Sequence, residues 1–170
     1  MPQLQVQNGS GLICGLFGIG SGATTSTFNY NLDRVLTSSA DQTQSWREFQ
    51  LDRDFATLRA RLRELRNLRQ GWDSYGSEAP SEESRTRAER ILGFLRSEKF
   101  LPTGVVPSAE GGVGICFVWD GGYADIECLN TGEILAVAYK GADRPTVWEF
   151  EYRDAAIRNG IDRLRRHISD

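Results

Sequence analysis

Lysine is scarce in this sequence, which places it only at Lys99 and Lys140, and the net charge is −3 at pH 7. Proteins that coat nucleic acid or an anionic membrane carry an excess of positive charge, so the composition argues against that function. The scarcity also argues against a phosphate-binding loop in the stretch GLFGIGSGATT, because that motif needs a lysine after its glycines. We therefore expect no nucleotide cofactor.

Histidine and cysteine are scarce as well. The one histidine, His167, stands beside Arg165 and Arg166, where we expect either an exposed side chain or one that interacts with the dipole at the C-terminal end of a helix. The three cysteines form no C-x-x-C pair and lack metal-ligand spacing, so we expect no metal site. We expect their thiols to be free, as in a reducing, cytoplasmic compartment. Two of them, Cys116 and Cys128, are expected in the core, where a thiol is inert as a nucleophile.

Long hydrophobic runs are missing. The longest, GLICGLFGIG at residues 11–20, is too short to span a bilayer. No basic residues precede it, which is unlike a secretory signal. We expect no membrane span.

Residues 1–40 differ from the rest of the chain. They are rich in glycine, serine, threonine, asparagine and glutamine and carry almost no charge, so they cannot build a core of their own. Three interpretations remain open for this glycine-rich arm. It is flexible, or it docks onto a partner or a second copy through Leu16, Phe17 and their apolar neighbours, or it touches a membrane, since GLFGIGSGA resembles glycine-rich apolar peptides that insert into bilayers. Residues 41–170 then form the folded domain.

The folded domain is predicted to be α+β. Apolar residues recur every three or four positions within 41–70, and Ser81 begins a second helical pattern that ends near Lys99. Residues 105–152 alternate in hydrophobicity and contain turn signals, and a last helix follows. We expect an antiparallel meander of about four strands with helices packed on one face. The apolar stripe of the first helix is Leu51, Phe55, Leu58, Leu62 and Leu65.

The hydrophobic pattern also predicts the sheet register. With three-residue loops, Trp119 would lie opposite Tyr123, and Leu129 opposite Glu133. One face of the sheet would then be apolar and covered by helices. The other face would collect aromatic and acidic side chains, and either a partner or a further element of this chain would cover it. That second face would hold Phe117, Trp119, Tyr123, Asp125, Glu127, Val137 and Tyr139.

The stretch GWDSYG, residues 71–76, joins the first two helices and favours a structural corner. We expect Gly71 to end the helix, Trp72 to fill the core, and Asp73 to bond the backbone of the turn. Tyr75 would cover the joint and Gly76 would adopt a positive φ. A catalytic role for Asp73 and Tyr75 would need a partner group, and none lies nearby in sequence. We therefore expect no enzyme.

The order of helix, GWDSYG, PS, helix, VVPSAEGGVGICFVWDGGY and hairpin resembles a set of small bacterial proteins. That set shares the GWD-x-YG corner, the P-S helix start and the P…GGV…W strand. The resemblance covers about residues 65–152 and leaves out the glycine-rich arm. Because such proteins are often encoded near toxin–antitoxin or phage-defence genes, the resemblance implies a role beside those systems. It implies no catalytic residues.

Arginines on the first helix offer an alternative function. Arg59, Arg63 and Arg66 fall on one flank at helical spacing and would be able to follow a phosphate backbone. Acidic residues interleave with the arginines, and this favours a solvated, ion-paired surface.

The sequence as a whole favours a non-enzymatic protein-binding module that acts by occluding or assembling with a partner, such as a toxin or a defence effector. A second copy of the chain is the other candidate partner. Aromatic side chains surrounded by acids suit a basic protein, since tryptophan and tyrosine dominate interface energetics. The alternatives are a nucleic-acid-binding regulator and a protein that self-assembles through its arm. The residues expected to contact a partner are Leu16, Phe17, Trp119, Tyr123, Asp125 and Glu127.

Overall fold

The computed structural model describes residues 32–169, so the predicted contacts of Leu16 and Phe17 lie outside the described residues. Three α-helices, one 3-10 turn and five strands follow one another in the order α1, η1, α2, β1 to β5, α3. The fold is α+β, as the sequence predicts.

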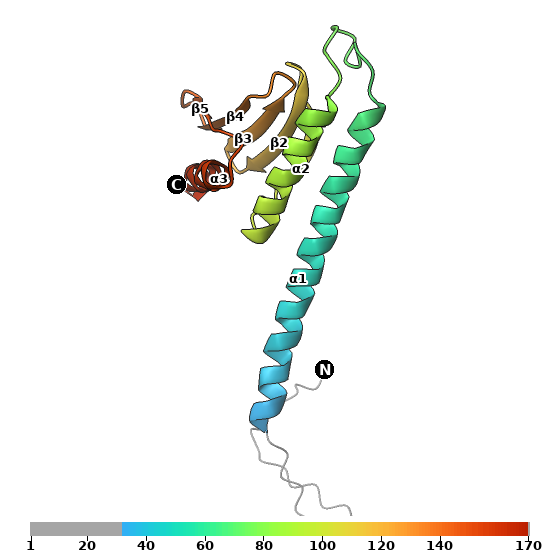
Figure 1. Cartoon of the computed structure of the whole chain (residues 1–170). Coiled ribbons are helices and arrows are strands. Elements are labelled where there is room, and N and C mark those ends of the chain that lie inside the picture. Colours follow the sequence, from blue (N-terminus) through green and yellow to red (C-terminus); the bar gives the residue numbers. More distant parts are fainter. Residues whose placement is uncertain (1–31, 170) are drawn as a thin grey trace, which may run out of the picture.

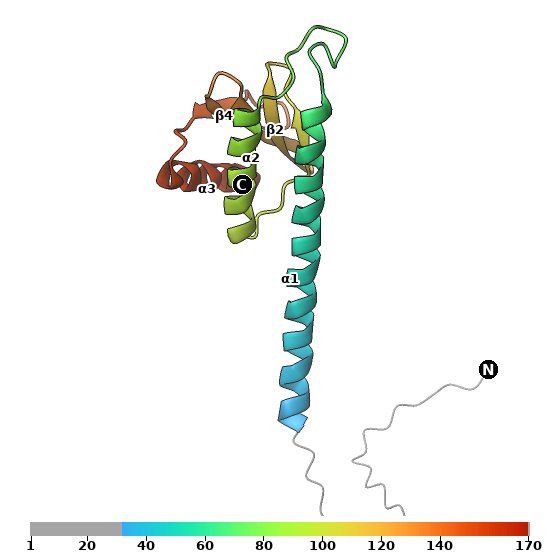
Figure 2. The ribbon, with the colours of Figure 1, turned by 45° about the vertical axis from the view of Figure 1, so that its right-hand side comes forward.

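Helix α1, Leu32–Glu64, is 33 residues long, which corresponds to about 50 Å. It begins within the segment expected to be an arm, and it ends at Glu64 in the 3-10 turn η1, Leu65–Asn67, before the expected end near residue 70. The apolar stripe predicted for this helix, which we call the leucine stripe, faces the rest of the domain, where Phe55, Leu58 and Leu62 are buried. The stripe covers only the second half of the helix. The first half extends past the domain, as Figures 1 and 2 show.

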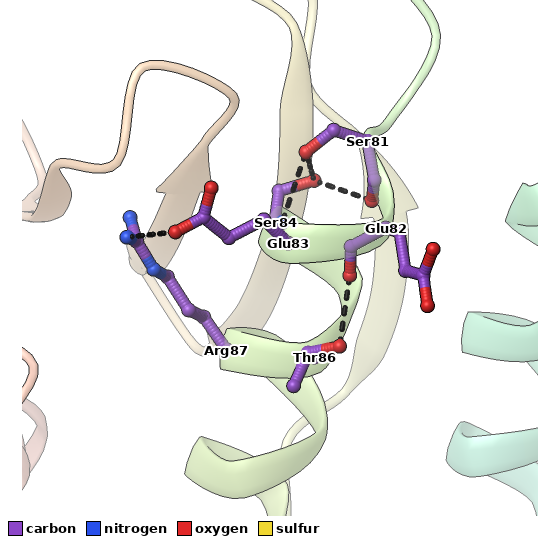
Figure 3. A network of polar contacts seen from close by, with 6 residues as sticks. All are labelled: Ser81, Glu82, Glu83, Ser84, Thr86 and Arg87. Carbon is purple, nitrogen blue, oxygen red and sulfur yellow. Dashed lines mark hydrogen bonds and ion pairs between the residues drawn. The ribbon is translucent and has the colours of Figure 1, made fainter.

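Helix α2, Glu82–Ser97, starts at a well-formed N-terminal cap (Figure 3). The Ser81 hydroxyl accepts a hydrogen bond from the Ser84 amide at 3.0 Å, which satisfies one of the free amides of the first turn. Glu83 pairs with Arg87 at 2.6 Å one turn along the helix. Asn130, from a distant loop, accepts a hydrogen bond from the Ser81 amide at 2.8 Å. The start of α2 is thereby tied to the sheet.

A cluster of ion pairs joins α1 to the end of α2. Arg96 contacts Glu48 at 3.2 Å and Asp52 at 2.6 Å, and Lys99 also pairs with Glu48. Hydrogen bonding to Lys99 lowers the pKa of Glu48, and hydrogen bonding to Arg96 lowers the pKa of Asp52. The two helices are thus held together up to Glu48, and α1 continues beyond that point alone.

The strands form one antiparallel meander in the order β1-β2-β3-β4-β5. A short strand, β1, forms one edge of the sheet, so the sheet has five strands rather than about four. Helices α1, α2 and α3 (Asp154–Ser169) contact strands from one side, and α2 lies across the middle of the sheet (Figures 1 and 2). The strands are β1 Gly104–Pro107, β2 Gly112–Trp119, β3 Gly122–Leu129, β4 Ile134–Lys140 and β5 Thr146–Glu149.

The register of the first hairpin corrects the prediction. Asp120 and Gly121 form a two-residue loop, so Trp119 lies opposite Gly122, and Val118 lies opposite Tyr123. Gly121 has φ +72°, a conformation that favours glycine. Every side chain of β2 therefore lies on the face opposite to the predicted one. The three-residue second loop is correct, because the Leu129 amide donates to the Glu133 carbonyl at 3.0 Å.

With this register one sheet face is apolar and carries the core. From β2 it takes Ile115 and Phe117, which replace the predicted Cys116 and Val118. Phe117 stacks on Phe100 with ring centroids 4.8 Å apart. The strand residues fully or largely buried on this face are Val105, Val113, Ile115, Phe117, Ala124, Ile126, Cys128, Ile134, Ala136, Ala138 and Trp148.

His167 lies in the last turn of α3, where a basic side chain complements the helix dipole, but it is not exposed, so that alternative is wrong. Its ring stacks on Trp148 of β5 at 5.5 Å and is half-buried. Arg163 lies over the same indole at 4.6 Å. The histidine helps to fix α3 on the sheet.

Candidate protein-interaction surface

The strand positions that point away from the helices form a continuous surface, which we call the outer sheet face. Two of its apolar side chains are largely exposed, Val118 by 59% and Val147 by 58%. Within residues 32–169, the helices that contact the sheet cover only its other face. The residues of the outer sheet face are Val106, Cys116, Val118, Tyr123, Asp125, Glu127, Leu135, Val137, Tyr139, Val147 and Glu149.

Two acids and two tyrosines lie together on β3 and β4, at the middle of the outer sheet face. The Tyr123 hydroxyl donates a hydrogen bond to Asp125 Oδ2 at 2.8 Å. Glu127 Oε1 accepts one from the Ser108 hydroxyl, also at 2.8 Å. Tyr139 lies opposite Tyr123 on β4, with the ring centroids 5.6 Å apart. The acids are held in fixed positions by neutral donors.

The fold does not supply hydrogen-bond donors to both carboxylate oxygens of Asp125. Its Oδ1 atom is buried and has no hydrogen-bond partner among the described residues. Burial of the carboxyl and the nearby charge of Glu127 raise the pKa of Asp125, and the bond from Tyr123 only partly opposes this. A buried acceptor without a donor costs about 1–3 kcal/mol. Such a group is a candidate for function because it weakens the fold that carries it.

Charge on the outer sheet face has one sign. Asp125, Glu127 and Glu149 are its ionisable acids, and its strand positions include no lysine, arginine or histidine. Aromatic and aliphatic side chains fill the space between the acids. A surface of this composition attracts cationic groups and offers tyrosine rings on which they can stack.

Cys116 belongs to this surface and not to the core. It lies opposite Asp125 on the neighbouring strand, and its sulfur is 3.5 Å from the Tyr123 hydroxyl. Burial raises the pKa of the Cys116 thiol, and the charges of Asp125 and Glu127 raise it further. The thiol is therefore protonated at neutral pH, which suits a packing role and not a nucleophilic one.

Trp119 is the one member of the predicted contact set within the described residues that lies elsewhere. Its ring packs over Gly122 on the helix-covered side, so closely that a Cβ at position 122 would overlap it. The error follows directly from the wrong loop length. Tyr123, Asp125 and Glu127 stay together on the outer sheet face. Val118 and Val147 were missed, although the Asp-Gly pair at the first turn was a signal for the shorter loop.

The GWDSYG corner is held by Asp73. This carboxylate accepts hydrogen bonds from the amides of Tyr75 and Ser77 and from the Ser77 hydroxyl, the last at 2.5 Å, and these bonds lower its pKa. Gly71 and Gly76 have positive φ. Trp72 is only half-buried and so does not fill the core, and Tyr75 is 95% exposed and covers no joint. Both oxygens of Asp73 thus accept hydrogen bonds within the turn, as expected for a structural corner.

The positive charge of the arginines considered for nucleic-acid binding, Arg59, Arg63 and Arg66, is partly neutralised. Arg59 pairs with Glu89 at 2.8 Å, and Arg63 donates to the Arg59 carbonyl at 3.3 Å. Arg66 lies in η1 and is exposed. Arg63 lines a groove of about 510 Å³ between α1 and α2 together with Glu82 and Glu89. Arg85 and Arg90 line the same groove, so it presents both signs of charge.

Among residues 32–169, no group of three or more histidine, cysteine, aspartate or glutamate side chains is arranged to hold a metal ion. No helix in the same range is both long and apolar enough to cross a membrane. Comparison with family models, with curated proteins and with solved structures gave no match. The outer sheet face is therefore the strongest candidate for a functional surface in residues 32–169.

Proposed function

We propose that this protein is a binding module without catalytic activity, and that its outer sheet face contacts a basic segment of another protein. The observation that carries the proposal is Asp125, a half-buried carboxylate whose buried Oδ1 atom has no donor among the described residues, at the centre of a sheet face that no element within residues 32–169 covers. A cationic partner would compensate this charge, whereas the fold alone leaves it uncompensated.

Composition supports a protein partner over a nucleic acid. The cores of protein interfaces are enriched in tyrosine and depleted in charge, and the few buried charges are paired with the partner. On the outer sheet face Tyr123 and Tyr139 supply the aromatic contact, while the acids would repel phosphates. A lysine or arginine side chain can lie over either ring and face the carboxylates from there.

The setting in which such a module acts is proposed from the resemblance alone. Proteins with the same corner and strand motifs are often encoded near toxin–antitoxin or phage-defence genes. We accordingly propose that the partner is a toxin or a defence effector in the cytoplasm, which the module neutralises or assists by covering part of its surface.

Selection from displayed random peptides tests the proposal even though the partner is unidentified. The immobilised full chain should enrich peptides rich in lysine and arginine. Their binding should be lost when Asp125→Asn and Glu127→Gln are combined. Glu110→Gln is the matched control, because this exposed acid lies outside the strands. Enriched peptides without basic residues, or binding that survives the double substitution, would refute the proposal.

A further inference from the structure

The first half of α1 has an aromatic pair in open solvent. Trp46 is 66% exposed and Phe49 is 57% exposed, and their rings meet edge to face at 6.2 Å. Between residues 41 and 50 every side chain except that of Glu48 is exposed, and Figures 1 and 2 show this part of the helix clear of the domain. A single helix in water gains little stability by itself, so a partner would stabilise it.

Three further residues continue this pair into a stripe of five along α1, at alternating spacings of three and four. At 3.6 residues per turn, such spacing keeps side chains on one side of a helix. This side is opposite to the leucine stripe that packs on the domain. We call it the outward stripe, and it consists of Trp46, Phe49, Arg53, Ala56 and Ala60.

The side chains of the outward stripe are large at one end and small at the other. Its aromatic residues come first, and Ala56 and Ala60 follow, with Ala56 exposed. We infer that α1 pairs antiparallel with α1 of a second copy of this chain. In that arrangement Phe49 lies opposite the second copy's Ala60, and Trp46 lies opposite the second copy's Arg63. A guanidinium over an indole is a favourable contact.

Charge on the flank fits the same pairing. Asp52 and Arg59 lie on one side of the outward stripe, seven residues apart, so in an antiparallel pair each faces the opposite charge of the second copy. Each already has a partner within the chain, Arg96 for Asp52 and Glu89 for Arg59. The new contacts would join these pairs into one network. Parallel pairing would instead place Arg53 against Arg53 and alanine against alanine.

The area available is close to what a dimer needs. A large aromatic side chain buries about 150–250 Å², so two tryptophans and two phenylalanines supply roughly 600–1,000 Å². Stable interfaces start at about 1,200 Å² in total, and the alanines and flanking charges supply the remainder. The domain lies on the other side of α1 and does not obstruct the second copy. This surface is separate from the outer sheet face.

Sedimentation velocity of the full chain over a range of concentrations tests the pairing. The wild type should show a dimer, and Trp46→Ala with Phe49→Ala should raise the dimer Kd by at least about 30-fold. Val118→Ala with Val147→Ala is the matched control, since it trims two equally exposed apolar side chains elsewhere and should leave the dimer intact. Circular dichroism confirms that each variant folds.

A swap of side chains tests the antiparallel direction. Phe49→Ala alone should weaken the dimer, and adding Ala60→Phe should restore it, because the ring returns to the same layer from the second copy. A wild type that stays monomeric at every concentration would overturn the inference. A dimer whose Kd is unchanged by the aromatic substitutions would overturn it equally, and so would a swap that does not restore the dimer.

Discussion

Replacing Asp125 by asparagine removes a buried charge that this fold leaves without a full set of donors. The substitution keeps the shape of the side chain and an oxygen that can accept the hydrogen bond from Tyr123. Because both burial and the charge of Glu127 raise the pKa of Asp125, the charged form is disfavoured in the folded state. The variant should therefore be more stable than the wild type at neutral pH.

The size of the effect follows from the unpaired Oδ1 atom. Leaving a buried acceptor unpaired costs about 1–3 kcal/mol, and the amide of asparagine recovers only part of this. We expect a gain of about 1 kcal/mol in the free energy of unfolding, or about 4 °C in Tm for a domain of this size. Urea titration and thermal melting of both proteins would measure it. Glu149→Gln, an exposed acid on the same face, should change stability by less than about 0.5 kcal/mol.

The difference between Asp125→Asn and the wild type should depend on pH in one direction. The folded wild type binds the Asp125 proton more tightly than the unfolded chain does, so protonation stabilises it. The advantage of the variant is complete above the raised pKa, shrinks as the pH falls through it, and is gone below the ordinary value of an aspartate. An Asp125→Asn protein that is less stable than the wild type at neutral pH would refute the reasoning. A stability advantage of the variant that persists unchanged in acid would refute the reasoning as well.

Other substitutions probe the register and the corner. Gly122→Ala should cost about 2–3 kcal/mol because its Cβ would overlap the ring of Trp119, and an unchanged urea midpoint would contradict the two-residue loop. Asp73→Ala should lower the free energy of unfolding by about 2 kcal/mol, because it removes the hydrogen bonds that close the turn. Tyr75→Ala should leave stability unchanged, because this side chain is exposed. Equal effects of the two substitutions in thermal melts would count against this account of the corner. Burial raises the pKa of Cys128 to about 12, so, with the other two cysteines replaced by serine, its thiol should react with Ellman's reagent only after denaturation. Rapid labelling in the native protein would place it outside the core.

The second hairpin was predictable because Asp125 and Glu127 alternate with apolar residues along β3, which determines that Ala124, Ile126 and Cys128 share the buried face. The first was not predicted because Ile115, Cys116, Phe117 and Val118 are all apolar, so hydrophobicity alone does not choose a face for β2. The close fit of Trp119 on Gly122 decides the register, and it depends on contact between two residues across the turn.

Helix α1 shows where a periodic pattern stops being informative. The leucine stripe predicted the half that packs on the domain. Residues 32–47 lack that stripe, and the helix there extends past the end of α2, so no apolar periodicity indicates a helix that begins at Leu32. Tyr123, Asp125 and Glu127 were grouped correctly, since alternate residues of one strand share a face whatever its neighbours do.

The most direct test of the central claim is to map the contact on the ¹⁵N-labelled full chain by NMR, titrating a selected basic peptide. The largest amide shift changes should fall on β3 and β4, around Tyr123, Asp125, Glu127 and Tyr139. Shift changes centred instead on Arg59 and Arg63, or on the helix-covered side of the domain, would contradict the outer sheet face as the binding surface.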